Sequence, residues 1–373
     1  MPAFTPFLLE EYQSLYERTV EYNLADSSVK CVNTREWLTP DDIETYLDTG
    51  LFYPEVNGTT ALRDAIAALY PGADRDNVLV TVGAAEANSL VCQTLLQAGD
   101  EVVVMTPGYR QIWGTAHNMG CNVRELPLDP ERGWRIDASS LATLITPGTR
   151  LVAVVNPNNP TGSIMTSAEM QAVVDACARV GAWLHVDEVY TGTEYPGVPD
   201  TRSFWGMYDR LILSNSLSKA YGLAGLRIGW AVSNHETVTE LWRRHEYATI
   251  AAAAPSMTLA TIALQPAKRA QLFARQRSIS QDGVAVMRTW IAGETRRFSV
   301  QPAQATSIAF VRMHFDMTSY DFAEAVRTRG NVLIAPGSTL GAEHHLRITV
   351  GYPEDVIRTS LQRVSAVADA LGM

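Results

Sequence analysis

The sequence has little positive charge and few cysteines, and each shortage excludes a class of protein. Thirty Lys and Arg residues against 40 Asp and Glu give a net charge of −10, and the basic residues form no run. Nucleic acid and anionic membranes are therefore poor partners for this chain. The cysteines lack the spacing of metal ligands, so we expect no metal site and reduced thiols in a cytoplasmic protein. They are Cys31, Cys92, Cys121 and Cys177.

Long apolar runs, repeats and one common nucleotide-binding motif are also missing. No stretch is long enough to span a membrane, and the N-terminus lacks the basic and apolar parts of a signal peptide. No G-x-G-x-x-G follows the first predicted strands, which argues against a Rossmann dehydrogenase. With 46% apolar residues in a chain of 373, we expect a soluble enzyme with one large and one smaller domain.

Apolar runs that alternate with helical patterns predict an α/β fold. Strands rich in Val, Leu and Ile, separated by helices, are typical of a mostly parallel sheet that is covered on both faces, here with seven strands. We predict a large domain over residues 45–265. Its strands are predicted at 78–82, 101–106, 121–126, 150–155, 182–186, 209–214 and 226–232, and its helices near 60–70, 85–97, 110–119 and 167–180.

The two ends of the chain are expected to form the smaller, α+β domain, from residues 1–44 and 266–373. Apolar residues Leu8, Tyr12 and Leu15 predict a helix over residues 5–20, and Thr39 caps a second short helix. Residues 235–290 have helical patterns only. Further strands are predicted near 298, 307–313, 332–335 and 346–350, and helices near 319–329 and 354–371.

The motif richest in chemistry is the stretch from Ser214 to Trp230, between two predicted strands. A lysine that forms a Schiff base needs a dry pocket and cationic neighbours, while hydroxyls with an arginine suit a phosphate. The stretch supplies Ser216, Ser218, Lys219 and Arg227. It resembles the S-x-S-K-x-x-G-x-x-G-x-R-x-G signature of class I and II aminotransferases, which implies fold type I and pyridoxal 5'-phosphate on Lys219. The alternative is an exposed lysine on a serine-rich loop.

Two further motifs resemble the family's contacts to the cofactor ring. Asp187 ends a predicted strand in D-x-x-Y, where a carboxylate can pair with a protonated pyridine nitrogen. The resemblance also implies that Tyr190, and Asn159 of N-P-T-G, hydrogen-bond the ring's 3-oxygen. Alone, Asp187 would be a loop cap and the Asn159 motif a plain turn.

A strand-to-helix turn at Gly83 is suited to an anion. Free N–H groups and the dipole at the start of the helix favour a phosphate, which Ala84 and Ala85 would bind through their backbone. Tyr109, in P-x-Y, resembles the aromatic residue that stacks on the pyridine ring. The alternative is that Tyr109 is a core aromatic.

The resemblance also implies a homodimer and a carboxylate-binding arginine. Tyr53 lies in a segment similar to the one that crosses the family's dimer interface and gives its hydroxyl to the neighbour's phosphate, so the sites would be shared. Arg347 resembles the arginine that binds the substrate α-carboxylate, for which a guanidinium is suited. It would otherwise be a surface arginine on a strand.

The N-terminal residues depart from the common pattern. Many members of the family have a glycine-proline segment where this chain has Ala25-Asp26-Ser27-Ser28, so the usual backbone contact to the substrate changes there. The region is similar instead to capreomycidine-synthase-like cyclases and pyridoxal-phosphate arginine oxidases. That resemblance implies an N-terminal helix over the site, with Glu11 and Asp26 receiving a guanidinium near Ser27. The alternative is an ordinary surface helix.

Two enzymatic hypotheses remain open from the sequence. In the first, an aminotransferase, the substrate amine displaces Lys219, which then removes the Cα proton with the support of Asp187. In the second, a cyclase, dehydratase or oxidase acts on arginine or hydroxyarginine through the same first steps. Both use the same lysine, so the sequence does not separate them. A transcription regulator of this fold is disfavoured, because the short segment before Tyr53 is acidic.

Overall fold

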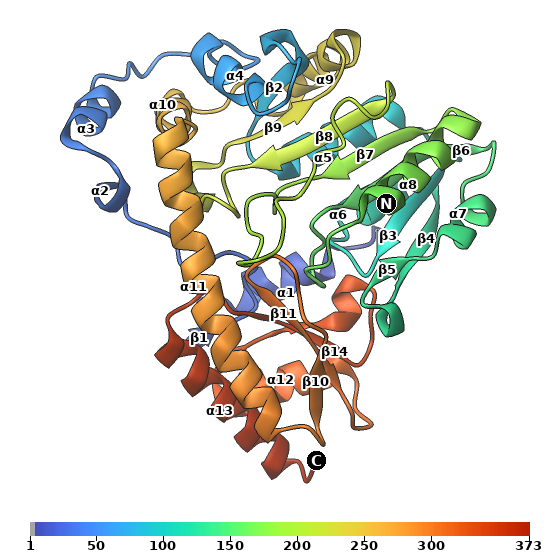
Figure 1. The fold of residues 1–373 in the computed structure, drawn as a ribbon, viewed down its shortest axis with the longest axis vertical. Coiled ribbons are helices and arrows are strands. Elements are labelled where there is room, and N and C mark those ends of the chain that lie inside the picture. The colour runs from blue at the N-terminus through green and yellow to red at the C-terminus, as the bar shows by residue number, and fades with distance from the viewer. Residues whose placement is uncertain (1–3) are drawn as a thin grey trace.

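The structure is a computed structural model that describes residues 4–373. Its centre is an eight-stranded sheet with the order β2-β9-β8-β7-β6-β3-β4-β5 (Figure 1). The strands β8, β7, β6, β3 and β4 are parallel, whereas β9 and β5 run antiparallel to their neighbours. The bounds are β2 Val78–Thr81, β3 Glu101–Thr106, β4 Asn122–Asp129, β5 Arg135–Ile136, β6 Thr149–Val155, β7 Trp183–Asp187, β8 Leu211–Ser216 and β9 Gly229–Val232.

All seven predicted strands are present in this sheet, and the fold class is confirmed. The eighth strand, β5, was not predicted, because its two residues are too few to form a periodic pattern. It pairs with the end of β4 and continues the sheet beyond the predicted edge.

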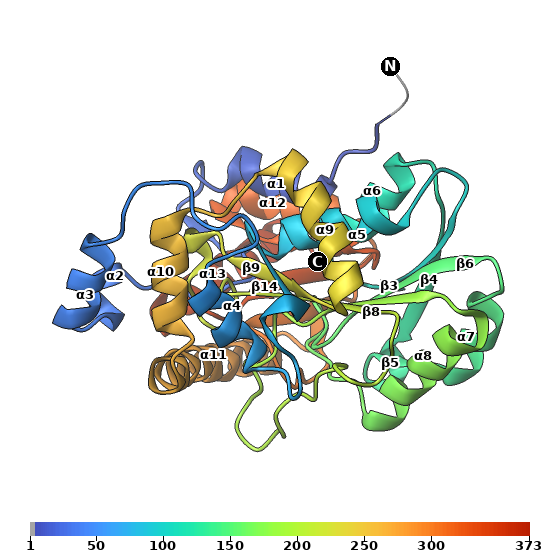
Figure 2. The ribbon, with the colours of Figure 1, turned by 90° about the horizontal axis from the view of Figure 1, so that it is seen from above.

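Helices cover both faces of the sheet, as Figure 2 shows. In β2, Leu79 packs with the cluster beneath α5, α6 and α9, while Val78 and Val80 belong to the cluster on the other face. This alternation follows from the two-residue period of a strand. The bounds are α4 Thr60–Ala67, α5 Ala84–Leu95, α6 Gln111–Asn118, α7 Ala138–Leu144, α8 Ser167–Val180 and α9 His235–Ala248.

A second, antiparallel sheet forms in the C-terminal part of the chain, with the order β10-β11-β14-β13. The predicted strand at 332–335 is divided: β13 belongs to this sheet, and β12 pairs with β1 from the N-terminus. The N-terminal segment therefore lies with the C-terminal part, but the domain boundaries themselves stay a prediction. The bounds are β1 Tyr22–Asn23, β10 Phe298–Val300, β11 Ile308–Met313, β12 Val332–Leu333, β13 Ala335–Pro336, β14 His345–Thr349, α12 Ser319–Gly330 and α13 Glu354–Ala370.

The helical stretch predicted at 235–290 consists of three helices. The helical structure is interrupted after α9 and again before α11. The helix α11 passes along the side of the molecule in Figure 1. At the other end of the sequence, α2 and α3 extend away from the main body. Thr39 caps α3 as predicted, accepting the N–H of Asp42. The bounds are α2 Thr34–Trp37, α3 Pro40–Leu47, α10 Ala254–Ala263 and α11 Pro266–Gly293; short 3₁₀ turns are η1 Arg75–Asn77, η2 Pro130–Arg132, η3 Ala224–Leu226 and η4 Gly337–Leu340.

The N-terminal helix α1 spans Leu8–Tyr16 and is shorter than predicted. Its buried residues are Leu9 and Tyr12, whereas Leu8 and Leu15 are 54% and 59% exposed. The predicted burial of Tyr12 is therefore confirmed, whereas that of Leu8 and Leu15 was wrong. The sequence allows either leucine to face the core, because leucines occupy positions 8 and 9 and apolar residues positions 15 and 16.

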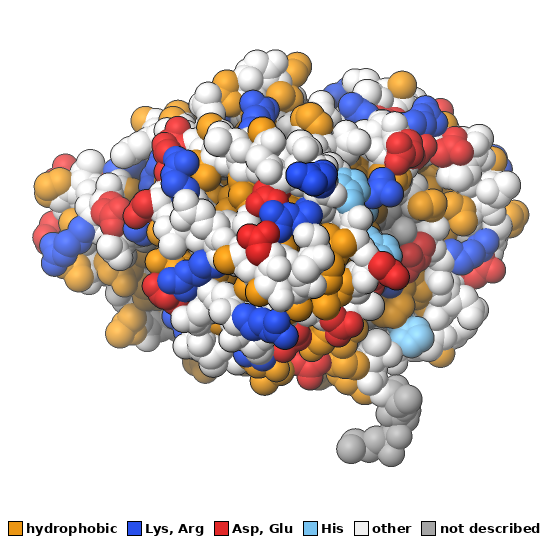
Figure 3. All heavy atoms as spheres, turned by 90° about the horizontal axis from the view of Figure 1, so that it is seen from below, with side chains coloured by type: hydrophobic (Ala, Val, Ile, Leu, Met, Phe, Trp, Pro, Cys, Tyr) orange, Lys and Arg blue, Asp and Glu red, His pale blue; other side chains and the backbone are white. Residues whose placement is uncertain are grey.

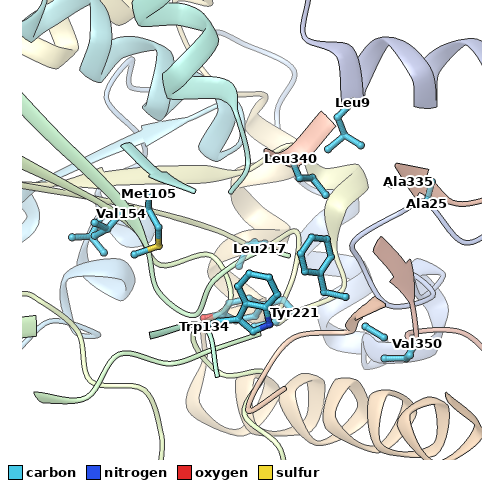
Figure 4. Packing of buried hydrophobic residues seen from close by; sticks show 14 of the residues in the cluster. Leu9, Ala25, Met105, Trp134, Val154, Leu217, Tyr221, Ala335, Leu340 and Val350 are labelled. Carbon is cyan, nitrogen blue, oxygen red and sulfur yellow. The ribbon is translucent and has the colours of Figure 1, made fainter. Parts of the chain in front are cut away.

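One continuous cluster of buried apolar side chains joins the two parts of the molecule. It extends from Met105 and Val154 in the large sheet to Leu340 and Val350 in the C-terminal part (Figure 4). On the face drawn in Figure 3, basic and acidic side chains are interspersed. Within residues 4–373, no helix has both the length and the apolar character that crossing a membrane requires.

Candidate active site

A cavity of about 480 Å³ lies at the carboxyl ends of β6, β7 and β8, beneath α1. In open α/β sheets this edge is where ligands bind. The cavity brings together most of the predicted residues, from six separate stretches of sequence. They are Asp26, Ser27, Ala84, Ala85, Tyr109, Asn159, Asp187, Tyr190, Ser216, Ser218, Lys219 and Arg227.

A larger cavity of about 600 Å³ lies elsewhere, beside Glu188, Arg269 and Phe273, and contains none of the predicted residues. We assign the active site to the smaller cavity, because the chemistry of its lining, and not its volume, decides what it can do.

Lys219 projects into the cavity from the loop that follows β8. The loop is closed by backbone bonds, from the Leu217 N–H to the Ile228 carbonyl and from the Leu223 N–H to the Leu217 carbonyl. Nζ of Lys219 donates to Oγ of Ser27 at 2.8 Å and to Oγ of Ser28 at 3.1 Å. Ser28 was not predicted, and its part in the site becomes visible only when the N-terminal segment is folded over the loop.

Asp187 is buried at the end of β7. Burial raises the pKa of this carboxyl, against the effect of two hydrogen bonds that favour the carboxylate. Its Oδ1 accepts the Val189 N–H at 3.1 Å, and its Oδ2 accepts Nδ2 of Asn88 at 3.3 Å. Gln111 accepts from the same amide of Asn88. Asn88 and Gln111 were not predicted, although an asparagine inside an apolar helix is a usable signal.

The start of α5 forms an anion seat, by which we mean Gly83, Ala84, Ala85 and the guanidinium of Arg227. Gly83 has φ 76°, and a side chain there would collide with the Arg227 guanidinium. Glycine is therefore required both for the turn and for the close approach. The N–H groups at the beginning of α5 face the same cavity, and the helix dipole makes that end positive.

Tyr109 lies between the cavity and α1. Its hydroxyl donates to Oε1 of Glu10 at 2.9 Å, and its ring lies 5.0 Å from that of Phe7. Burial, and then the charge of Glu10, raise the pKa of Tyr109, so the hydroxyl keeps its proton. The helix α1 thus covers the site, as the resemblance implied.

Arg347, on β14, is 1% exposed and lies behind Asn159. Its Nη1 donates to Oδ1 of Asn159 at 3.3 Å, and its Nη2 donates to the Ala25 carbonyl at 2.6 Å. Its Nε has no protein partner. Burial lowers the pKa of this guanidinium. The expectation of a surface arginine on a strand is thereby excluded.

Four predicted residues do not line the cavity. Gly83 and Arg347 lie directly behind lining residues, whereas Tyr53 and Glu11 lie away from it. Tyr53 is 85% exposed, in the segment between α3 and α4. Glu11 is on the outer side of α1, which corrects its predicted place in the site. The residues of α1 and its C-cap that line the cavity recur at i, i+3, i+4 and i+7, the positions on one face of a helix. They are Glu10, Gln13, Ser14 and Glu17.

Comparison with known proteins identifies the family. The profile of a family described as "Aminotransferase class I and II" matches residues 43–364. The chain belongs to this family. It is an enzyme, and its cofactor is pyridoxal phosphate.

Individual relatives agree with this assignment. Capreomycidine synthase from Streptomyces vinaceus is 32% identical over 318 residues, which cover 84% of this chain and 79% of that protein. An arginine–pyruvate transaminase from Pseudomonas aeruginosa is 36% identical over 51% of this chain and 50% of its own length. A solved structure of a PLP-dependent aminotransferase from Streptococcus suis has a TM-score of 0.91, with 29% identity and 99% of each chain covered.

The residues of the cavity fit the cofactor. Asp187 is a buried carboxyl that forms no ion pair with a described Lys, Arg or His, and it is suited to a protonated ring nitrogen. The anion seat is suited to a phosphate. Lys219 lines the same cavity, so its amine is available to a bound aldehyde.

Proposed function

We propose that this aminotransferase uses Lys219 as its base and acts on an amino acid with a basic side chain. The observation that carries the proposal is that one cavity holds the lysine, the buried Asp187 carboxyl and the anion seat. When bound, pyridoxal phosphate supplies a ring that withdraws electrons from the substrate Cα. Lys219 would then take the proton from Cα and return it to the cofactor carbon on the other side of the substrate nitrogen, which is the proton movement that transamination requires.

The other side chains hold the cofactor in place. Asp187 keeps the ring nitrogen protonated, Tyr109 stacks on the ring, and Asn159 and Tyr190 hydrogen-bond its 3-oxygen. Support for these roles comes from their place around one cavity. The phosphate is bound by backbone N–H groups of the anion seat, by Arg227, and by the hydroxyls of Ser216 and Ser218.

Arg347 binds the substrate α-carboxylate in this proposal. Its guanidinium lies beside Asn159, and its Nε is buried without a protein partner. A planar guanidinium binds a carboxylate through two parallel hydrogen bonds, which also fixes the orientation of Cα towards Lys219.

The preference for a basic side chain rests on the acidic residues under α1. Glu10 accepts the hydroxyl of Tyr109, and Asp26 accepts the N–H groups of Ser27 and Ser28. Glu17 forms only a 3.5 Å pair with Arg18, whose side chain is 91% exposed. We therefore propose Glu17 as the acceptor for a guanidinium, in place of Glu11. The name of one relative, arginine–pyruvate transaminase, supports this substrate class.

A cyclase, dehydratase or oxidase acting on arginine or hydroxyarginine is the second candidate. It is favoured by the similarity to capreomycidine synthase and by the two serines at Lys219 in the segment where the family has glycine-proline. Hydroxyls at that amine are polar groups that can relay a proton to a leaving group.

We also propose a homodimer with shared sites. The segment between α3 and α4 exposes Leu51, Phe52 and Tyr53 by 90%, 70% and 85%. Such a group of apolar side chains is typical of a surface that is covered by a partner. The four free cysteines support the proposal of a cytoplasmic protein. The domain division at residues 45 and 266 stays part of the proposal.

Incubation of the purified enzyme with arginine, hydroxyarginine, alanine and glutamate tests the function, with and without pyruvate or 2-oxoglutarate. An aminotransferase forms a keto acid and a new amino acid only when the acceptor is present. A cyclase, dehydratase or oxidase forms its product without an acceptor. Mass spectrometry distinguishes these products, and Lys219→Ala is the control.

A further inference from the structure

His245, near the end of α9, is completely buried and faces two hydrogen-bond acceptors. Its Nδ1 lies 2.9 Å from Oε1 of Glu86, and its Nε2 lies 3.1 Å from the carbonyl oxygen of Val56. A carbonyl never donates, and an ionised carboxylate does not either. A neutral imidazole has one N–H and would satisfy only one of them, whereas an imidazolium satisfies both.

The alternative, a proton on Glu86, is opposed by the other groups around that carboxyl. Oε2 of Glu86 accepts the Val82 N–H at 2.6 Å, and Oε1 accepts the Thr249 hydroxyl at 2.7 Å. Burial disfavours the carboxylate, but these bonds and the one from His245 outweigh it and lower the pKa of Glu86. The geometry is therefore that of an ion pair.

The ion pair of His245 and Glu86 lies directly beside the anion seat. Glu86 is the third residue of α5, and its carboxylate binds the N–H that precedes Gly83. A carboxylate in the first turn of a helix lowers the positive electrostatic potential at that end, and it would repel a phosphate bound there. A cationic His245 cancels that charge.

His245 also forms hydrogen bonds with two other segments, through its imidazole and through its backbone carbonyl. Val56 belongs to the segment that continues back to Tyr53, and its neighbour Asn57 accepts the N–H of Val80 in β2. On the other side, Ile250 has φ 69°, a strained conformation for a β-branched residue, and its N–H is bound by the His245 carbonyl.

We propose that His245 is a positioning residue for the cofactor phosphate: as an imidazolium it neutralises Glu86 and keeps the start of α5 able to bind a dianion. This rests on the proposed role of the anion seat. Within residues 4–373, Glu86 is the charged group that hydrogen-bonds His245. The segment 54–58 presents only the Val56 carbonyl, and α9 itself presents the Thr249 hydroxyl.

The test compares the affinities of the apoenzyme for pyridoxal phosphate and for pyridoxal at pH 7. The ratio of the two affinities isolates the phosphate, because both aldehydes react with the same lysine. The free phosphate is mostly a dianion at this pH, since its second pKa is about 6.

The variants are His245→Gln, Glu86→Gln/His245→Gln and, as a matched control, Thr249→Val, which removes a bond to Glu86 without changing a charge. At pH 7, His245→Gln should lower the ratio roughly threefold to thirtyfold, the range of a single charge at a helix end. The double variant should recover most of this loss, and Thr249→Val should keep the wild-type ratio.

The proposal is overturned if His245→Gln, with an unchanged circular dichroism spectrum, keeps the wild-type ratio, or if it weakens pyridoxal as much as pyridoxal phosphate. If His245→Gln does not fold, Glu86→Gln decides: it removes the carboxylate beside the seat and leaves the imidazolium, so the ratio should rise, and an unchanged ratio overturns the proposal. Arg227→Gln separates this failure from failure of the proposed seat. An unchanged ratio in Arg227→Gln refutes the seat itself, whereas a lowered ratio there with no effect of His245→Gln refutes only the role of His245.

Discussion

Lys219 and Ser27 lie 192 residues apart in the sequence, and yet Nζ of the lysine donates to the serine hydroxyl at 2.8 Å. The lysine comes from the loop after β8, and the serine from the N-terminal segment that pairs with the C-terminal part. The site is therefore assembled from both ends of the chain. Its reactive amine is held by a segment in which this protein departs from the common pattern of its family.

Replacing Lys219 by alanine should abolish turnover and leave the fold intact, because the side chain is a donor at a cavity wall and not part of the apolar core. Borohydride reduction of the wild type should leave the cofactor mass on the peptide that contains Lys219. The variant should carry none. A label on another lysine would refute the assignment.

Glu17→Gln should weaken the binding of arginine, because it removes the acidic side chain of α1 that lacks a partner in the site. A charge-assisted hydrogen bond is worth about 1.5–3 kcal/mol, so KM for arginine should rise roughly tenfold or more. KM for alanine should not change. Glu11→Gln is the matched control, since Glu11 lies on the same helix but faces away. Equal effects of the two variants would contradict the proposed role of Glu17.

The contribution of Glu188 to the stability of the apoenzyme should fall as the pH rises from about 4.5 to about 7, because burial raises the pKa of Glu188 from 4.5 to about 7. The folded state then holds this proton more tightly than the unfolded state, so this contribution is greatest below the unfolded pKa and is lost through the folded one. The loss is at most on the order of 3 kcal/mol. The buried His185, whose pKa is lowered from 6.5 to about 4, contributes the opposite slope over much of this range, so the effect is measured as a difference between variants.

Urea unfolding at several pH values measures this effect. Glu188→Gln should remove the contribution of this residue to the slope of stability against pH, because an amide does not titrate. The fold should be kept, since the neutral amide can still accept the N–H of Phe204 that the carboxylate accepts. The exposed Glu246→Gln should leave the slope unchanged. The same slope in Glu188→Gln and wild type would mean that Glu188 is ionised in the folded protein throughout this range.

Mixing two inactive variants should restore activity if the sites are shared between subunits. Tyr53→Ala and Lys219→Ala each damage a different half of the site, so a hybrid dimer keeps one intact site. Random exchange of subunits should recover about a quarter of the wild-type activity. Sedimentation gives the oligomeric state in parallel. A fully active monomer would refute the dimer.

The residues around Lys219 could be predicted because they are contiguous: one loop contributes the lysine, both serines and Arg227, and their spacing is visible in the sequence. Asp187 and Asn159 were found in the same way, at the ends of apolar strands. Family membership and fold class are confirmed by the comparisons.

The site residues that could not be predicted from the sequence are those whose position depends on tertiary packing. The position of Glu11 was misjudged because the phase of a short helix is set by the surface it covers, and Leu8 and Leu9 fit two phases equally well. Ser28 and Gln111 carry no local signal of their role, and Asn88 carries only that of an asparagine inside an apolar helix. Each becomes part of the site only through a partner far away in the sequence.

The short pairing of β1 with β12 has a consequence for motion. Leu24 is bound through its backbone to Leu333 and Thr349, and the Ala25 carbonyl accepts from Arg347. The N-terminal segment and the strand that holds Arg347 are thus tied to each other by hydrogen bonds. In the proposed function these two segments bind the two ends of the substrate, so a movement of one segment would shift both contacts to the substrate together.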